Sequence, residues 1–424
     1  GGAAKEFEPV ASGTLPNGTA VVLKADGTVE AINPTSGGPS AGTPVVYGGD
    51  PSIQSAVFDS NSNKVIIAYR DTDDSAKGKA VVGTVSGTSI SFGTVVVFNA
   101  TNSANVTSTF DSNSNKVVIA WVDIATGLYL NAIVGTVSGT SISFGTKVVF
   151  KSAFSLTHRS SMTFDSNTNK VVIAYYVQGA NAEVIIGTVS GTSISFGTPV
   201  VFHSGATSEI AAVFDSNLNK IVVSYFDGTA TNSKSIVGTV SGTSISFGSN
   251  VVFHSGGVSG DLNSVFDSNS NKVIILYTNT AGQAGTAIVG TVSGTSISFG
   301  TAAVFSPNGN SDAYVTGAFD SSANKVVIAY KDYSNSSYGT AVVATLSGTS
   351  ISFGTPVVYE TGAIIDNAVA FDSVANKTVV FYGDDGNSGF GTAAVISSQG
   401  SNLTSTNFVG ITAEAIADTA TGKV

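Results

Sequence analysis

The residues with the most regular spacing that could bind an ion are an aspartate and two asparagines that recur beside a lysine, as in Asp215-Ser216-Asn217-Leu218-Asn219-Lys220. Hard cations prefer oxygen ligands, and Asp-x-Asn-x-Asn is the spacing of a calcium loop. The glycine and the distal glutamate of such a loop are missing, and a lysine takes the next position. We therefore predict no metal site, but a turn held by aspartate side-chain hydrogen bonds with an Asp–Lys ion pair at the hairpin end. The residues are Asp59, Asp111, Asp165, Asp215, Asp267, Asp320 and Asp372, with Lys64, Lys116, Lys170, Lys220, Lys272, Lys325 and Lys377.

A second group of candidate residues lies in segments that differ from copy to copy. His203 and His254 both follow Val-Val-Phe, and His158 stands beside Arg159. We see no recurrent carboxylate or nucleophile with these histidines, so a hydrolytic triad has little support, and the acidic stretches 71–74 and 384–386 are expected to be solvated loop tips. Aromatic rings here could stack on sugars or fill a protein interface, although single exposed aromatics are common. The predicted binding residues are Arg70, Asp73, Tyr129, His158, Arg159, His203, His254, Tyr314, Tyr333, Tyr338 and Phe390, and no catalytic residue or cofactor is predicted.

Two recurring sequence motifs, called words below, show how these residues must be positioned. Ser-Gly-Thr-Ser-Ile-Ser-Phe-Gly occurs six times from Ser86 to Ser347, at steps of 52, 52, 51, 52 and 54 residues. Phe-Asp-Ser followed by Asn-Lys and an apolar run occurs seven times, with the first copy at Phe58 and the last at Phe371. A fixed period near fifty, made of short strand-like words, is typical of a solenoid or a propeller.

One unit, from residue 208 to 253, contains four strand candidates: 209–214, 220–226, 235–240, and 244–247 continuing into 251–253. Second strands such as Val65-Ile66-Ile67-Ala68-Tyr69 are continuously apolar, which indicates burial on both faces. In a two-layer sandwich, one face of each strand would be exposed to solvent and would carry polar residues in alternation. A β-solenoid has shorter coils without such hairpins. The prediction is an all-β fold, a seven-bladed β-propeller of four-stranded blades with a small β accessory module from the two termini.

The domain boundaries follow from where the words stop. Residues 1–42 are predicted as an N-terminal hairpin and attachment segment, with strands at 19–23 and 28–32, and residues 401–424 as a C-terminal segment whose strand, 408–416, pairs with it. The propeller is assigned to 43–400, with blades beginning near residues 52, 104, 158, 208, 260, 313 and 365. The seventh unit lacks the fourth-strand word, whereas 43–47 matches the end of one. We expect 43–47 to supply an outer strand to the last blade.

The repeats vary on one side only. The turn between strands one and two and the turn between strands three and four are nearly constant. The loops between strands two and three differ in every unit, at 70–79, 122–130, 177–183, 226–234, 278–285, 331–339 and 383–391, and so do the connections from strand four to the next strand one. Alternate connections of an antiparallel meander emerge at the same edge, so the variable loops share one face. This face is the predicted binding face; drift in unconstrained loops is the alternative.

Composition excludes several classes of partner. The net charge is −10 with no lysine or arginine run, which argues against nucleic acid and anionic membranes. No stretch of eighteen apolar residues exists, so membrane insertion is not expected. There are no cysteines, which removes disulfides and thiolate metal sites.

The repeats Val-Gly-Thr-Val-Ser-Gly-Thr-Ser-Ile-Ser-Phe-Gly-Thr-Pro-Val-Val-Phe and Phe-Asp-Ser-Asn-x-Asn-Lys-Val-Val-Ile-Ala-Tyr resemble those of repeat-containing structural proteins of tailed phages, many of them marine. The flanking segments 11–15 and 408–416 also resemble parts of tail or fibre proteins. The resemblance covers nearly the whole chain and implies a non-enzymatic virion surface or tail-associated protein. It implies virion structural proteins as partners within an oligomeric assembly, and a host surface glycan or protein as the ligand of the variable face.

Three other interpretations stay open. The chain could be a secreted or cell-surface lectin-like module of a bacterium, or a capsid or tail cement protein that binds no receptor. A propeller glycosidase or lyase would need paired carboxylates at the ring centre, whereas the recurrent aspartates fall on the constant face.

Overall fold

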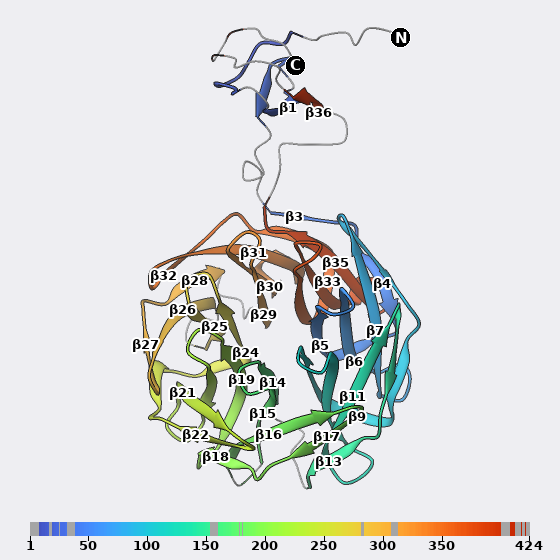
Figure 1. Ribbon diagram of the computed structural model, residues 1–424, viewed down its shortest axis with the longest axis vertical. Coiled ribbons are helices and arrows are strands. Elements are labelled where there is room, and N and C mark those ends of the chain that lie inside the picture. The colour runs from blue at the N-terminus through green and yellow to red at the C-terminus, as the bar shows by residue number, and fades with distance from the viewer. Residues whose placement is uncertain are drawn as a thin grey trace. The chain divides into compact units, whose positions relative to one another are not determined.

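The computed structural model describes residues 8–16, 19–24, 26–31, 39–152, 160–177, 179, 181–280, 284–306, 313–399, 408–411, 417 and 420. The chain divides into two compact units, one made of residues 1–40 and 398–424 and the other of residues 41–397. In the larger unit, antiparallel sheets follow one another around a common centre in the order of the sequence (Figure 1).

Each repeat forms an antiparallel meander, and the strands fall into groups by their rank in it. First strands are β5 (Pro51–Asp59), β9 (Val96–Asp111), β14 (Ser161–Asp165), β19 (Thr207–Asp215), β24 (Val258–Asp267), β29 (Ala313–Asp320) and β33 (Val357–Asp372). Second strands are β6 (Lys64–Asp71), β10 (Lys116–Asp123), β15 (Lys170–Tyr176), β20 (Lys220–Asp227), β25 (Lys272–Asn279), β30 (Lys325–Asp332) and β34 (Lys377–Asp384). Third strands are β7 (Lys77–Ser86), β11 (Tyr129–Ser138), β16 (Ala182–Ser190), β21 (Asn232–Ser241), β26 (Ala284–Ser293), β31 (Tyr338–Ser347) and β35 (Phe390–Ser397).

The outer edge of a sheet is built from two short strands instead of the single continuous one predicted. In one repeat, β22 (Ser244–Phe247) pairs with one half of β21 and β23 (Val251–His254) with the other half. The chain shifts register at Gly248, whose N–H donates to the Val237 carbonyl at 2.9 Å. Equivalents of β22 are β8 (Ser89–Phe92), β12 (Ser141–Phe144), β17 (Ser193–Phe196), β27 (Ser296–Phe299) and β32 (Ser350–Phe353), and those of β23 are β13 (Val148–Lys151), β18 (Val200–His203) and β28 (Ala303–Ser306).

Two long strands join neighbouring sheets. The beginning of β9 pairs with β7 and its end pairs with β10, so the boundary predicted near residue 104 falls inside a strand. In the same way β33 pairs first with β31 and then with β34. Hydrogen bonding therefore links four of the repeats into two nine-stranded sheets, while the others form five-stranded sheets.

The middle strands form the core of each sheet. Val65 to Tyr69 of β6 are at most 1% exposed, which confirms burial on both faces. The only helical turns in the described part of the chain are η1 (Tyr333–Asn335) and η2 (Asp385–Asn387). No helix among the described residues is long and apolar enough to cross a bilayer.

The repeated aspartates form tight turns between the first and second strands. In Asp215, Oδ1 accepts hydrogen bonds from the N–H groups of Asn217 and Leu218 at 2.9 and 3.0 Å. Asn219 has φ 55°, a left-handed conformation that asparagine tolerates better than most residues. The same pair of bonds recurs at each of the seven aspartates, which confirms the predicted turn.

The prediction of an Asp–Lys ion pair at the hairpin end is wrong in the three repeats in which the structure shows a hydrogen bond of the lysine side chain. The lysine stands opposite its aspartate in the ladder, as Lys220 does to Asp215. Its ammonium group instead reaches the third strand, because a threonine hydroxyl lies on the same face there. Lys170, Lys220 and Lys325 donate to the hydroxyls of Thr188, Thr239 and Thr345 at 2.9, 2.7 and 2.7 Å.

The first strands lie side by side around the centre, each next to the first strand of the following repeat, and β33 lies next to β5. One aromatic pair marks each junction between repeats, and it joins an outer-strand ring to the second-strand ring of the next sheet, with centroids 5.1–5.9 Å apart. These pairs are Tyr47–Tyr69, Phe98–Trp121, Phe150–Tyr175, Phe202–Tyr225, Phe253–Tyr277, Phe305–Tyr330 and Tyr359–Tyr382.

The N-terminal part of the larger unit completes the last sheet. Strand β4 (Val45–Gly48) pairs antiparallel with β35, and β3 (Ser40–Ala41) also pairs with β35. This confirms the outer strand predicted at 43–47. Tyr47 then contacts Tyr69, which belongs to the first repeat, so this segment joins the two ends of the repeat array.

The smaller unit contains one three-stranded sheet. Strand β1 (Ala20–Leu23) pairs with β2 (Val29–Ala31) on one side and with β36 (Phe408–Ile411) on the other, so both ends of the chain contribute. The buried side chains of Ala11, Leu15, Val21 and Val29 form its core. Of the strand predicted at 408–416, the part beyond Ile411 lies outside the described residues.

Candidate functional site

The two variable connections of a repeat meet at one face of the larger unit. In four repeats, the residue after the second strand donates its N–H to a carbonyl that lies just before the first strand or, in the case of Asn102, within the long strand β9. These bonds are Thr72 to Asp50 (2.8 Å), Ile124 to Asn102 (2.9 Å), Gly228 to Ala206 (2.9 Å) and Thr280 to Gly257 (3.2 Å). The variable loops therefore share one face, as the meander pattern predicts.

A cluster of polar side chains lies on this face at the junctions between repeats. The residue after the outer-strand Val-Val-Phe word comes from one sheet, and the aromatic residue near the end of the second strand comes from the next. Two positions after that aromatic residue stands an acid or amide in six repeats: Asp71, Asp123, Asp227, Asn279, Asp332 and Asp384. A carboxylate thus does recur on the variable face, and the expectation that none accompanies the histidines is wrong for His203, which lies beside Asp227, whereas His254 lies beside the amide Asn279.

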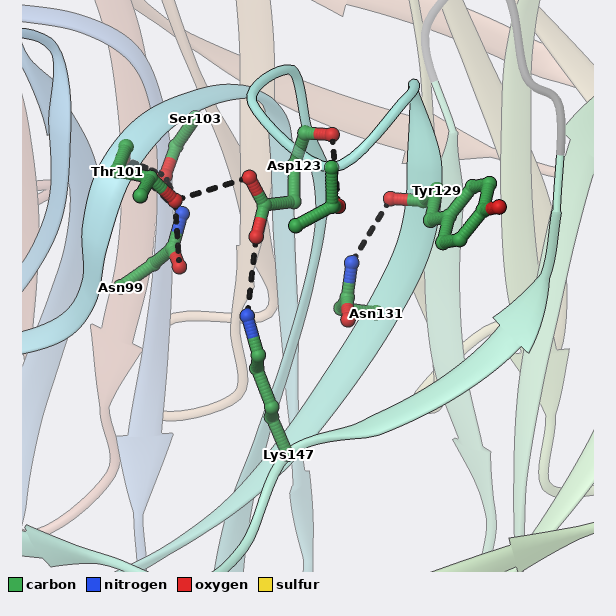
Figure 2. Close-up of polar contacts among 8 residues, drawn as sticks. Asn99, Thr101, Ser103, Asp123, Tyr129, Asn131 and Lys147 are labelled. Atoms are coloured by element: carbon green, nitrogen blue, oxygen red, sulfur yellow. Dashed lines mark hydrogen bonds and ion pairs between the residues drawn. The ribbon is translucent and has the colours of Figure 1, made fainter.

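The cluster around Asp123 shows how such a carboxylate is held (Figure 2). The Thr101 hydroxyl donates to Oδ1 at 2.9 Å and the Lys147 ammonium donates to Oδ2 at 3.0 Å. Asn99 donates to the Ser103 hydroxyl at 2.9 Å beside them. Asp123 is fully buried, so these bonds offset the cost of removing a charge from water.

His203 belongs to a similar cluster between β18 and β20. Its Nε2 lies 3.4 Å from Asp227 Oδ1, and Lys234 lies 2.6 Å from Oδ2. The imidazole packs on the Tyr225 ring with centroids 5.2 Å apart. Burial lowers the pKa of His203 although Asp227 opposes this shift. Burial also opposes ionisation of Asp227, but the Lys234 and Ala230 hydrogen bonds hold the pKa of that carboxyl below its ordinary value.

His254 occupies the same position one repeat later. Its ring packs on Tyr277 with centroids 5.4 Å apart, and Asn279 takes the place of the aspartate. Burial lowers the pKa of His254, and a hydrogen bond with Asn279 opposes the shift. The two histidines therefore share their packing but not their charged neighbours.

Other junctions place different groups at these positions. Lys151 donates to Glu183 at 2.8 Å, and the Tyr175 hydroxyl donates to the same carboxylate oxygen at 2.8 Å. In β33, Glu360 accepts a hydrogen bond from the Tyr382 hydroxyl at 3.0 Å. Burial, and then the negative charge of Glu360, raise the pKa of Asp384.

Two of the predicted tyrosines are brought together by a lysine. Lys331 Nζ lies 4.9 Å from the Tyr333 ring centroid and 5.9 Å from the Tyr314 ring centroid. Tyr333 is 40% exposed, so this cation–aromatic group faces solvent. Asp332, next to Lys331, accepts N–H bonds from Ser334 and Asn335 and thereby fixes the loop as η1.

The remaining predicted residues lie apart from these clusters. Arg70 donates to the Ser52 hydroxyl at 3.5 Å. Asp73 is the exception, since its backbone N–H donates to Asp71 Oδ1 at 3.2 Å. The Tyr129 ring points away from Asp123 (Figure 2). Tyr338 and Phe390 begin β31 and β35, and Phe390 is 41% exposed. His158 and Arg159 lie outside the described residues.

The buried carboxylates at the junctions are candidate site residues that the sequence analysis does not identify. Asp71 is 3% exposed and pairs with Lys79 at 2.7 Å, so it is not the solvated loop tip that was expected. The missed signal is the spacing aromatic-x-Asp at the end of five of the seven apolar second strands. Among the described residues, no three acidic or histidine side chains lie close enough together to hold a metal ion.

A polar cavity of about 230 Å³ lies at the centre of the larger unit. All seven first strands line it, and the described lining consists of hydroxyl, amide and apolar groups without a charged side chain. The paired central carboxylates that a glycosidase needs are therefore not found among the described lining residues.

The comparisons with known proteins concern the fold. No protein-family model matches the chain, and no curated protein matches it in sequence. Among solved structures, the BP39L lectin from Burkholderia pseudomallei has a TM-score of 0.62 at 12% identity, over 86% of this chain and 100% of that one. A variant of NanB sialidase from Streptococcus pneumoniae has a TM-score of 0.50 at 8% identity, over 86% of this chain and 70% of that one. A variant of Aleuria aurantia lectin in complex with Fucα1-6GlcNAc has a TM-score of 0.47 at 12% identity, over 75% and 99%. The chain thus shares an all-β, propeller-like fold that both a lectin and a sialidase use.

Proposed function

We propose that the larger unit is a seven-bladed β-propeller that binds glycans on its variable-loop face without catalysing a reaction. The observation that carries this proposal is the repeated junction cluster. An aromatic residue recurs at every junction, a tyrosine at six of them and Trp121 at the other, whereas the residue that follows the outer-strand ring of the previous sheet changes. The residue at this changing position is Gly48, Asn99, Lys151, His203, His254, Ser306 or Glu360. A constant scaffold with changing polar groups is typical of a recognition surface.

The chemistry of this face favours a sugar over other ligands. Carboxylates, amides, hydroxyls and lysines supply both donors and acceptors, and the Tyr333 ring is open to solvent. The net charge of −10 disfavours a nucleic acid or another polyanion. The fold shared with the BP39L lectin is compatible with this use, but a fold alone does not define a function.

The binding would be multivalent. Each junction presents a small cluster instead of a deep pocket, so a single contact is expected to be weak. Several such contacts on one rigid disc raise the overall avidity, because the second binding event becomes intramolecular. Because the clusters differ, branched or mixed glycans fit this surface better than a polymer of one sugar.

The test is a glycan array probed with the purified protein and two variants. Tyr333→Ala removes an exposed ring from the variable face, and we expect it to weaken binding at least about tenfold. Leu218→Ala changes a residue of similar exposure, 39%, in a constant turn and should bind like the wild type. Binding to no glycan, or an equal loss in both variants, would contradict the proposal.

A glycan hydrolase is the second candidate, since the sialidase shares the fold. Glu209 and Asp366 stand at left-handed positions of two first strands, with φ 48° and 52°. One Asp366 oxygen accepts the Gln54 N–H at 2.6 Å, which leaves it poorly placed for proton transfer. Release of a reducing sugar from an array-positive glycan, abolished in Glu209→Gln, would favour the hydrolase over the lectin.

The location of the protein remains a prediction. We propose a virion surface or tail location, with a secreted bacterial lectin and a cement protein as the alternatives. Electron microscopy of particles labelled with an antibody against the variable loops distinguishes them. Labelling on intact virions supports adhesion from the particle, labelling only of disrupted particles supports a cement protein, and recovery only from culture medium supports the secreted lectin.

The predicted oligomeric assembly is tested by the mass of the purified protein in solution.

A further inference from the structure

The central cavity is walled by side chains from every first strand of the larger unit. Polar side chains from six of these strands line it: Gln54 and Ser55, Thr107 and Ser108, Ser161, Asn263 and Ser264, Tyr314 and Thr316, and Asn367. No lysine, arginine, aspartate, glutamate or histidine stands among the described lining residues. An occupant would therefore meet hydrogen-bonding groups without net charge.

Three polar atoms of this wall are buried and have no hydrogen-bond partner within the described part of the chain: Gln54 Nε2, Asn263 Oδ1 and Ser264 Oγ. Gln54 is 9% exposed, and its Oε1 accepts a hydrogen bond from the Tyr47 hydroxyl, which fixes the direction of the amide. Buried polar groups are nearly always paired in native proteins, so these three require a partner that occupies the cavity.

Other polar groups of the same wall are already paired across the junctions between repeats. The hydroxyls of Ser55 and Ser108 lie 2.8 Å apart, and Ser161 accepts the Ala212 N–H at 2.9 Å. These bonds hold neighbouring first strands together. The three unpaired atoms are not needed for that purpose.

The backbone beside Gln54 is held in a strained form. Strand β5 has a register shift between Ser52 and Gln54, and Ile53, between them, has φ 54°. A left-handed conformation is costly for a β-branched residue, and such a bulge redirects the side chains beside it. The strain thus places the Gln54 amide at the cavity.

A second hollow adjoins the cavity toward the variable-loop end of the first strands. It is lined by Ile53, Asn105 and Ser160, and it shares Gln54 and Asn263 with the central cavity. The hollow of the central cavity therefore continues toward the variable-loop face. The opposite mouth is lined by half-buried phenylalanines, among them Phe58 and Phe110, and suits a polar molecule less well.

We propose that the central cavity binds one neutral, polyhydroxylated molecule of monosaccharide size. The Gln54 amide needs an acceptor, Asn263 Oδ1 needs a donor, and the Ser264 hydroxyl takes either. A hydroxyl group both donates and accepts, so adjacent hydroxyls on one ring satisfy all three atoms. This site is separate from the junction clusters of the variable face and does not depend on their function.

The test uses the full chain with glucose, galactose, mannose and L-fucose as probes, each titrated calorimetrically and soaked into crystals. We expect at least one of them to bind at one site per chain and to show density between Gln54 and Asn263. Asn263→Leu keeps the number and branching of the side-chain heavy atoms but removes the acceptor, and it should weaken this binding at least tenfold. Without sugar, its melting temperature should equal or exceed that of the wild type, because an unpaired polar atom is removed.

Ser264→Ala provides a second, less disruptive variant if Asn263→Leu does not fold, and it should also weaken the binding. Leu218→Ala should bind the monosaccharide like the wild type. Tyr333→Ala should lose array binding while keeping the central site, which separates the two proposals. Density for water alone, together with no binding below about 10 mM, overturns this inference, as does binding that neither cavity variant changes.

Discussion

At the scale of single residues, the variable face is built from side chains whose charge depends on burial. His254 is packed on Tyr277, and burial lowers the pKa of its imidazole below 6.5. Burial likewise raises the pKa of the Tyr277 hydroxyl to about 12. Both groups are thus neutral near pH 7, and the ring stack is free of charge.

We predict that acidification between about pH 7 and pH 5 destabilises the protein through this residue. The folded form holds His254 neutral, whereas the unfolded chain protonates it near 6.5. The stabilising contribution is therefore full above that value and is lost as the pH falls toward the lowered folded pKa. His254→Gln should show a smaller drop in melting temperature over this range.

Melting curves at several pH values check this prediction. Leu218→Ala, far from any histidine in the constant turn, should follow the wild-type pH dependence. His203 contributes in the same direction, so the single variant should remove only part of the slope. An unchanged slope in His254→Gln contradicts the prediction.

At the scale of strands and turns, a glycine packs closely against a turn of the neighbouring sheet at six of the seven junctions. A Cβ added to Gly197 would lie 2.1 Å from the Thr243 carbonyl oxygen of the following Ser-Gly-Thr turn. Five other glycines make the same approach to a turn threonine: Gly42, Gly93, Gly145, Gly248 and Gly300. The constancy of these words therefore reflects contact between sheets as well as the turns themselves.

We predict that Gly197→Ala lowers the free energy of unfolding by about 1–3 kcal/mol, because the added methyl forces backbone to move at the junction. Gly354 is the matched control, since the seventh repeat lacks the Ser-Gly-Thr turn. A Cβ there would meet no described atom closer than 3.6 Å. Gly354→Ala should unfold near the wild-type guanidinium concentration, and equal losses in both variants would contradict the prediction.

At the scale of the whole larger unit, stability depends on joining the ends of the repeat array. Strand β4 covers the edge of β35, and Tyr47 packs against Tyr69, Phe92 and Phe381. Tyr47 is 6% exposed. Without this segment the last sheet would present an unpaired edge and an exposed aromatic cluster.

We predict that deleting residues 1–48 sharply lowers the melting temperature, by the equivalent of at least about 3 kcal/mol from the loss of Tyr47 alone. Deleting residues 1–39 keeps β3 and β4 and is the control. That shorter deletion disrupts the terminal sheet but should leave the main transition near its wild-type temperature. Equal transitions in the two truncated proteins would show that the joining strand is dispensable.

The strands, their order and the joining segment could be read from the sequence because they depend on local signals. Each of these signals is contained in a few consecutive residues. They are the apolar runs, the asparagines in left-handed turns, and the outer-strand motif at 43–47 that has no repeat before it. The two faces could also be told apart, because variation alternates with constancy along the chain. The bulges in the first strands could not be predicted from the sequence, because no repeated motif marks Ile53 or the equivalent residues of other repeats.

Which side chains meet was decided only by the tertiary structure. Asp123 with Lys147, and His203 with Asp227, are pairs whose members lie 24 residues apart, brought together by how the strands and sheets pack. The register between sheets depends on glycine contacts and ring stacking that no single repeat contains. For the same reason the central cavity and its unpaired Gln54, Asn263 and Ser264 exist only once all the first strands stand around one centre.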